Sequence, residues 1–173
     1  MSDQKYYGKY RGTILVNVDP EFRGRVTLMV PDVLSLIPST WAEPCVPLAG
    51  PTGPPMGAYM VPPPGTPVWV EFEQGDPDYP IWSGCRWGSS GSIPPLAYAG
   101  LPISPNIVFQ TAGQNSLIIS DLPGPTGGIM LKSTTGASII VNDTGIYIQN
   151  GKGASIIMTG PTITVNQGAL TIT

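Results

Sequence analysis

Histidine is absent from this 173-residue chain, and only 11% of its residues carry a charged side chain. The net charge is −3 and no basic cluster occurs, which argues against a nucleic-acid partner because phosphate binding requires massed Lys and Arg. No apolar run reaches the roughly 18 residues of a membrane-spanning helix. The first residues also contain no apolar segment typical of a secretory signal, so the sequence predicts synthesis in the cytoplasm.

Cysteine is scarce as well, with one residue at Cys45 and one at Cys85. Both lie in apolar segments bounded by Pro and Gly, and their spacing is not that of a CxxC redox motif. Disulfides are disfavoured in the cytoplasm. The sequence therefore predicts two buried, reduced thiols, with a disulfide or a reactive thiol as the alternatives.

Glycine and proline are abundant instead, with 22 and 21 residues. A mean hydropathy of +0.11 predicts a folded chain, since disordered chains usually lack large apolar residues. This density of Pro and Gly excludes long helices and favours short strands joined by turns. The predicted fold class is therefore all-β.

The first half of the chain predicts a small Greek-key barrel of the OB type, covering residues 1–88. Its clearest strand places Val68, Val70 and Phe72 on one side of the pleat, in strict alternation with polar or amphipathic neighbours. A linker rich in Pro, Gly and Ser is expected at residues 89–105. The predicted barrel strands are residues 10–18, 25–30, 42–46, 67–73 and 81–86.

The second half, residues 106–173, is an internal repeat with a period of 17 residues. The segment GASII at residues 136–140 recurs at 153–157, and a weaker copy stands at 114–118. A second series of strands has the same 17-residue offset. Each period thus carries two short strands and two turns, a pattern typical of stacked β-structure.

Every repeated strand has apolar residues at positions i and i+2, so each has one continuous apolar face. One thin chain cannot bury so many faces, whereas three chains wound together can close each other's edges. The sequence therefore predicts an intertwined triple-stranded β-helix in a homotrimer, about eight strands and on the order of 40 Å long. The predicted trimer core consists of Ile139, Val141, Ile146, Ile148, Ile156, Met158, Ile163 and Val165.

Several segments resemble a known family. Residues 6–33 are similar to the opening of the OB domain in phage baseplate assembly protein V and in the valine-glycine repeat spike of type VI secretion. Residues 39–47 also resemble this domain, and the run Gln74-Gly-Asp-Pro-Asp-Tyr-Pro80 is its most distinctive feature. The resemblance implies a non-enzymatic, homotrimeric spike at the centre of a phage-tail or injection-machine baseplate. Sheath contraction would drive the β-helix into the target membrane.

The chain departs from some members of this family in ways that shape the expected partners. The linker leaves no room for a lysozyme domain, and without His there is no His-x-His iron site at an apex. The fused hub domain of some type VI spikes is also missing, so a separate hub protein is expected at the OB end. A separate tip protein with proline-alanine-alanine-arginine (PAAR) repeats is expected on the last strand, at Leu170, Thr171, Ile172 and Thr173.

Other interpretations depend on carboxylates and tryptophans. The acidic residues could form a metal site or a hydrolytic pair, but turn formation explains them without chemistry. Three Trp residues could form a glycan-binding face on an OB-type tail module, and a depolymerase would need a carboxylate pair in the shaft. We expect no catalytic residue, no metal and no cofactor. The residues concerned are Glu71, Glu73, Asp76, Asp78, Asp121 and Asp143, with Trp69, Trp82 and Trp87.

Overall fold

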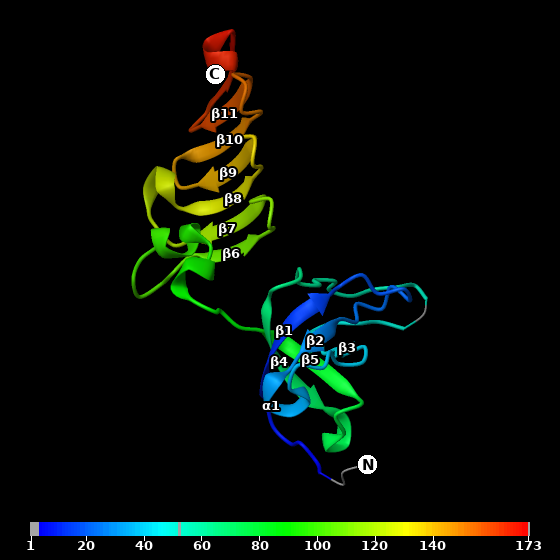
Figure 1. Cartoon of the computed structure of the whole chain (residues 1–173). Coiled ribbons are helices and arrows are strands. Elements are labelled where there is room, and N and C mark those ends of the chain that lie inside the picture. Colours follow the sequence, from blue (N-terminus) through cyan, green and yellow to red (C-terminus); the bar gives the residue numbers. More distant parts are fainter. Residues whose placement is uncertain (1–3, 52, 173) are drawn as a thin grey trace. The chain divides into compact units, whose positions relative to one another are not determined.

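A computed structural model of the protein describes residues 4–51 and 53–172 (Figure 1). The chain divides into two compact units, the first ending at Ser90 and the second beginning at Gly91. Both are built mainly from strands, which confirms the predicted all-β class. Among the described residues, no helix combines the length and the apolar character needed to cross a membrane.

The first unit is a curled five-stranded sheet with the strand order β2-β1-β4-β5-β3. Its pairings are antiparallel, except that β3 runs parallel to β5. A short helix, α1 (Pro31–Leu34), follows β2. All five predicted strands are present, most of them a few residues shorter than expected. They are β1 (Tyr10–Val16), β2 (Thr27–Met29), β3 (Glu43–Pro44), β4 (Pro67–Phe72) and β5 (Pro80–Cys85).

The core of the first unit forms on one side of this sheet. The two sides of β4 differ in burial, because Val68, Val70 and Phe72 are buried while Trp69 and Glu71 are only partly so. Each such side chain contributes roughly 1.5–3 kcal/mol when it leaves water. The buried cluster is completed by Ile14, Val26, Leu28, Val30, Ala42 and Trp82.

A buried carboxylate organises the loop between β1 and β2. Asp19 accepts backbone N–H bonds from Glu21, Arg23 and Arg25 at 3.0, 2.8 and 3.3 Å. Its Oδ1 also lies 2.7 Å from Nη2 of Arg25. The hydrogen bonds from the Arg25 side chain hold the pKa of Asp19 well below its usual range, and the backbone donors act in the same direction.

The second unit contains a single eight-stranded antiparallel sheet in which every strand pairs with its neighbours in sequence (Figure 1). In one chain the 17-residue repeats therefore form an up-and-down meander with two strands per period. The strand count matches the expected eight. The eight strands are β6 (Ile107–Gln110), β7 (Ser116–Ser120), β8 (Gly128–Lys132), β9 (Ser138–Asn142), β10 (Gly145–Gln149), β11 (Ser155–Thr159), β12 (Thr162–Val165) and β13 (Leu170–Ile172).

The segment expected as a linker contains local structure. A 3-10 turn, η3 (Pro95–Ala99), stands before β6. Asn106 ties this turn to the start of the sheet, because its side-chain amide donates to the carbonyl of Leu96 at 2.8 Å and its backbone N–H donates to Ala97. These bonds fix η3 next to the first strand of the meander.

The two cysteines differ from the expectation of buried thiols. Cys45 and Cys85 are both free, and both are exposed, so the prediction of burial is wrong. Cys45 follows the two-residue strand β3, and Cys85 is the last residue of β5, so each lies where its strand ends. Partial desolvation nevertheless raises the pKa of the Cys85 thiol, which disfavours the reactive thiolate.

Candidate functional site

One side of the second sheet is apolar along its whole length. Because paired residues of neighbouring strands point to the same side, the register lines up the alternate positions of all strands in two columns. We call these residues the apolar face. The first column holds Phe109, Leu117, Leu131, Ile139, Ile148, Ile156, Val165 and Leu170. The second holds Ile107, Ile119, Ile129, Val141, Ile146, Met158 and Ile163.

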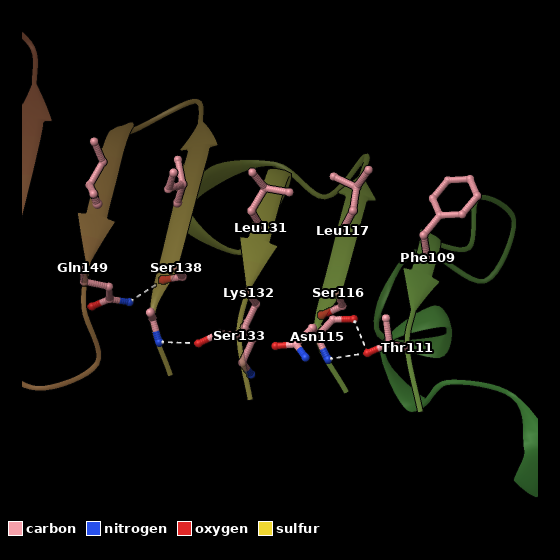
Figure 2. Close-up of a pocket in the computed structure, with 13 residues that line it drawn as sticks. Phe109, Thr111, Asn115, Ser116, Leu117, Leu131, Lys132, Ser133, Ser138 and Gln149 are labelled. Carbon is pink, nitrogen blue, oxygen red and sulfur yellow. Dashed lines mark hydrogen bonds between the residues drawn. The ribbon is translucent and has the colours of Figure 1, made fainter. Parts of the chain in front are cut away.

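The apolar face is open to solvent in a single chain. Phe109, Leu131 and Ile139 are 57%, 49% and 43% exposed. Figure 2 shows Phe109, Leu117 and Leu131 in one row across adjacent strands, all pointing to the same side. Contiguous exposed apolar surface on this scale marks an interaction site, since monomeric proteins rarely leave it uncovered.

All eight residues predicted as trimer core lie on the apolar face. Ile148 pairs with Ile139 on one side and with Ile156 on the other, and Ile146 likewise lies between Val141 and Met158. Ile163 and Val165 continue the two columns on β12. The structure thus brings these side chains together as neighbours. Whether they face a threefold axis stays a prediction.

The same face extends over β6, β7 and β8, where sequence reasoning named no core residue. Phe109, Leu117 and Leu131 belong to strands that show the same apolar i, i+2 spacing as the later repeats. The signal was present there, but the repeat in this region is weaker and the turn between β7 and β8 is longer than the one between β9 and β10, which hides the period.

The opposite side of the sheet is different in composition. Its central column runs through Ile118, Met130, Ile140 and Ile157 to Thr164, and it is flanked by Ser, Gly, Asn, Gln and Lys. Near β7 and β8 it is covered, because Leu96 and Ala99 of η3 line a hollow together with Ile118 and Met130.

Asparagine side chains close several turns of the meander. Asn142 Oδ1 accepts the backbone N–H groups of Thr144 and Gly145, and Asn150 Oδ1 accepts those of Lys152 and Ala154. These Asx-type bonds satisfy donors that the strands leave free at their ends. The turns are thereby fixed by their own residues.

Other bonds join a turn to the next turn along the same edge of the sheet. Asn115 Oδ1 accepts the N–H of Thr134 at 3.2 Å, and Asp143 Oδ2 accepts the N–H of Gly124 at 3.0 Å. Each bond connects segments about one repeat apart in sequence. On both edges of the sheet, side-chain hydrogen bonds therefore connect the turns in addition to the backbone hydrogen bonds between strands.

Two glycines allow strands to begin close to their neighbours. Gly128 and Gly145 have φ values of 86° and 157° and stand at the first positions of β8 and β10. A Cβ at Gly128 would meet the carbonyl oxygen of Val141, and one at Gly145 would meet that of Met158. The repeat therefore requires glycine at both positions.

The residues predicted to dock a tip protein lie at the far end of the sheet. Leu170, Thr171 and Ile172 form β13, which pairs through its backbone with β12. Within the described residues the other edge of β13 has no strand beside it. Thr173 lies outside the described residues.

Four of the six carboxylates considered for chemistry, those of Glu71, Asp76, Asp121 and Asp143, take part in local hydrogen bonds or ion pairs. Asp76 Oδ1 accepts the N–H of Asp78 at 3.1 Å, an Asx turn, and Glu71 lies 3.0 Å from Lys9 Nζ. Asp121 Oδ2 accepts the hydroxyl of Ser104 at 2.6 Å. Among the described residues no three His, Cys, Asp or Glu side chains are grouped so that they could hold a metal ion.

The three tryptophans considered for glycan binding do not share a face. Trp82 is 5% exposed and donates its indole N–H to the carbonyl of Gly24. It pairs with Val70, so the adjacent residue Trp69 points to the opposite side of the sheet. Trp87, 62% exposed, follows the end of β5.

Comparison with known proteins gives two matches to family models. Residues 10–87 match the type VI secretion system/phage-baseplate injector OB domain. Residues 106–171 match the phage baseplate V C-terminal trimerisation domain. A search of curated proteins found no match. The boundary between the two matched regions falls in the segment that contains η3.

Proposed function

Because this chain belongs to the phage baseplate V family of phage and type VI secretion injectors, we propose that it is the central spike that pierces the target envelope on sheath contraction. Both matched families are structural baseplate domains, and a trimerisation domain implies a homotrimer. The proposed role is accordingly mechanical and non-enzymatic. After synthesis in the cytoplasm, the trimer would be assembled into the baseplate of a phage tail or a tail-like particle.

The apolar face is the observation that carries this proposal. Two continuous columns of Ile, Leu, Val, Met and Phe stand open to solvent, and no second layer covers them within the described part of the second unit. Three copies that turn these faces inward would bury them around one axis. The result would be a narrow rod with backbone hydrogen bonds along its whole length, and such stacks resist unfolding.

Two partners follow from the ends of such a rod. A separate hub protein would hold the OB unit, and a PAAR-repeat tip protein would cap the strand edge of β13. Addition of a partner to a free strand edge uses main-chain hydrogen bonds and needs no special side chains. The target membrane would be contacted only transiently, during penetration.

The trimer is tested by the mass in solution, which should be three times the 18.2 kDa of one chain.

Piercing is tested in the parent particle. Deletion of the gene should abolish envelope breach, measured as dye entry into target cells, and the wild-type chain should restore it. A second test uses a variant that trimerises and joins the baseplate normally but whose β13 cannot bind a tip protein. This variant should restore assembly of the particle without full penetration. Particles that lack this chain and still contract and penetrate would contradict the proposal.

A further inference from the structure

The charged side chains of the second unit are few and are sorted by sign. Residues 106–173 contain four of them, Asp121, Lys132, Asp143 and Lys152, and all four are exposed. Strand β8 ends at Lys132, and the chain turns there before β9 begins at Ser138. Because every pairing in this sheet is antiparallel, alternate turns lie on opposite edges.

Both lysines therefore lie on one edge of the sheet and both aspartates on the other. Lys132 ends β8, and Lys152 lies in the next turn on that edge, between β10 and β11. Asp121 follows β7, and Asp143 follows β9, both on the opposite edge. We call these the lysine edge and the aspartate edge.

The charges also match in height along the stack. Counted from β6, Asp121 lies in the turn between the second and third strands of the sheet, and Lys132 lies at the end of the third strand. Asp143 lies between the fourth and fifth strands, and Lys152 between the fifth and sixth. With about 5 Å between strands, the members of each pair differ in height by about one spacing or less. A lysine side chain spans that difference.

Among the described residues none of these four charges lies beside an opposite charge. The ion pairs in the described part of the molecule all belong to the first unit. Asp121 and Asp143 accept only uncharged donors, from Ser104 and Gly124. The ammonium groups of Lys132 and Lys152 make no hydrogen bond or ion pair with the described residues of their own chain.

A threefold axis along the stack brings the two edges together. Rotation places the lysine edge of one copy against the aspartate edge of the next, since a cyclic interface joins two different surfaces of the same chain. We propose that Lys132 pairs with Asp121 and Lys152 with Asp143 of the neighbouring copy, and that these pairs set the axial register of the trimer. This inference rests on the trimer of the proposed function.

The apolar face alone does not specify that register. Its columns repeat every two strands, so a chain shifted by about 10 Å would again place aliphatic side chains on aliphatic side chains. Hydrophobic contact is non-directional and does not distinguish the two alignments. At a corner between shifted chains only one of the two opposite-charge pairs would remain, Lys152 with Asp121 or Lys132 with Asp143, and a staggered ring would not close. Exposed pairs add little stability, but they contribute to specificity.

Self-sorting of chains tests the proposal. The charge-swapped chain carries Lys132→Glu, Lys152→Glu, Asp121→Lys and Asp143→Lys, and is labelled with heavy nitrogen. It is refolded with an equal amount of wild type at low ionic strength, and the trimers are weighed by native mass spectrometry. Random mixing gives about three mixed trimers for each pure one. We expect mixed trimers to fall several-fold below that ratio, because every mixed ring contains a corner of like charges.

A neutral chain with Gln at both lysines and Asn at both aspartates is the matched control and should mix with wild type near the random ratio. Sorting should disappear at about 1 M salt, where the screening length is about 3 Å. Random mixing of intact wild-type and swapped trimers at low salt would overturn the ion pairs while leaving the trimer in place. A single-chain mass for wild type would instead overturn the proposed trimer.

A second variant covers the case in which the swapped chain does not refold. Lys132→Glu with Lys152→Glu removes no hydrogen bond of the described residues and makes both edges acidic. Its trimer should melt at a lower temperature than the Lys→Gln pair at low salt, and the gap should close at high salt. Equal melting of the two variants at low salt would contradict the proposal.

Discussion

Strands in both units of this chain alternate apolar with other residues, but the apolar side chains are buried to different extents. Val68 and Val70 in β4 are 0% exposed, whereas Ile139 and Ile156 in the second unit are 43% and 41% exposed. In the first unit the sheet curls on itself, so its inner side is closed within one chain. In the second unit the strands form one layer, and a single layer cannot enclose a core.

The difference shows that alternation identifies a face and leaves open what covers it. The first unit should fold as an independent domain with a stability that does not depend on concentration. The second unit should gain its stability on association, so its unfolding should depend on protein concentration.

The largest effect is expected from Ile156→Asp, which places a carboxylate in the apolar face of each chain. Burying an unpaired charge costs on the order of several kcal/mol, and a trimer contains three. The trimer should lose its resistance to heat and detergent, measured by melting and by gel mobility without boiling.

Its neighbour Ile157 provides the control, because this residue points to the opposite side of the sheet. Ile157→Asp should leave most of the trimer's resistance intact. Equal loss in the two variants, or an unchanged melting curve for Ile156→Asp, would show that the apolar face is not the buried one.

A second comparison uses two truncations of similar size. Leu28 is 0% exposed in the first unit, so Leu28→Ala should destabilise that unit by about 2–5 kcal/mol at any protein concentration. Ile139→Ala should instead weaken the trimer, and its effect should grow on dilution. Denaturant unfolding at two concentrations, followed by Trp fluorescence for the first unit and by mass for the trimer, separates the two. A concentration-independent effect at both positions would abolish the contrast.

Much of this arrangement could be predicted from local patterns. The alternation in β4 placed Val68, Val70 and Phe72 on one side of the pleat, and the 17-residue period predicted the strands and placed Ile146 and Ile148 on one face. Both signals depend only on the two-residue period of a strand, which sequence displays directly.

Other features depend on three-dimensional context that no short pattern carries. The carboxylate of Asp19 is buried because a loop folds its own N–H groups around it, and the parallel pairing of β3 brings distant segments together. The exposure of Cys85 depends on where its strand ends. The sorting of Lys132 and Asp143 to opposite edges becomes visible only when the direction of each strand is known.

Gly145→Ala should have an intermediate effect, confined to the second unit. The added Cβ would meet the carbonyl oxygen of Met158, so β10 must move away from β11. We expect a loss of roughly 1–3 kcal/mol in trimer stability. Gly153→Ala is the matched control, because Gly153 also has a positive φ, 104°, but a Cβ there meets nothing within 4 Å. Equal melting temperatures for the two variants would show that the close approach at Gly145 is unimportant.

The smallest expected effect concerns pH and the first unit. Bonds from Arg25 and the loop backbone lower the pKa of Asp19 in the folded state, so the ionised form is favoured by folding. The stability that Asp19 provides is therefore complete above its unfolded pKa of about 4 and decreases as the pH falls below that value. Asp19→Asn should lower the stability of the first unit at neutral pH and flatten its decline in acid.

The control for Asp19 is Asp32→Asn at an exposed carboxylate in the first turn of α1. It should leave both the neutral stability and the acid decline close to wild type. At neutral pH either change should leave the stability of the trimer nearly unaffected. The trimer is expected to depend on association of the second units through their apolar faces, and the Asp19 loop belongs to the first unit. If Asp19→Asn weakened the trimer as much as it weakened the first unit, the two units would not be stabilised separately. The first unit would then not have a core closed within one chain that is independent of the apolar face buried between chains.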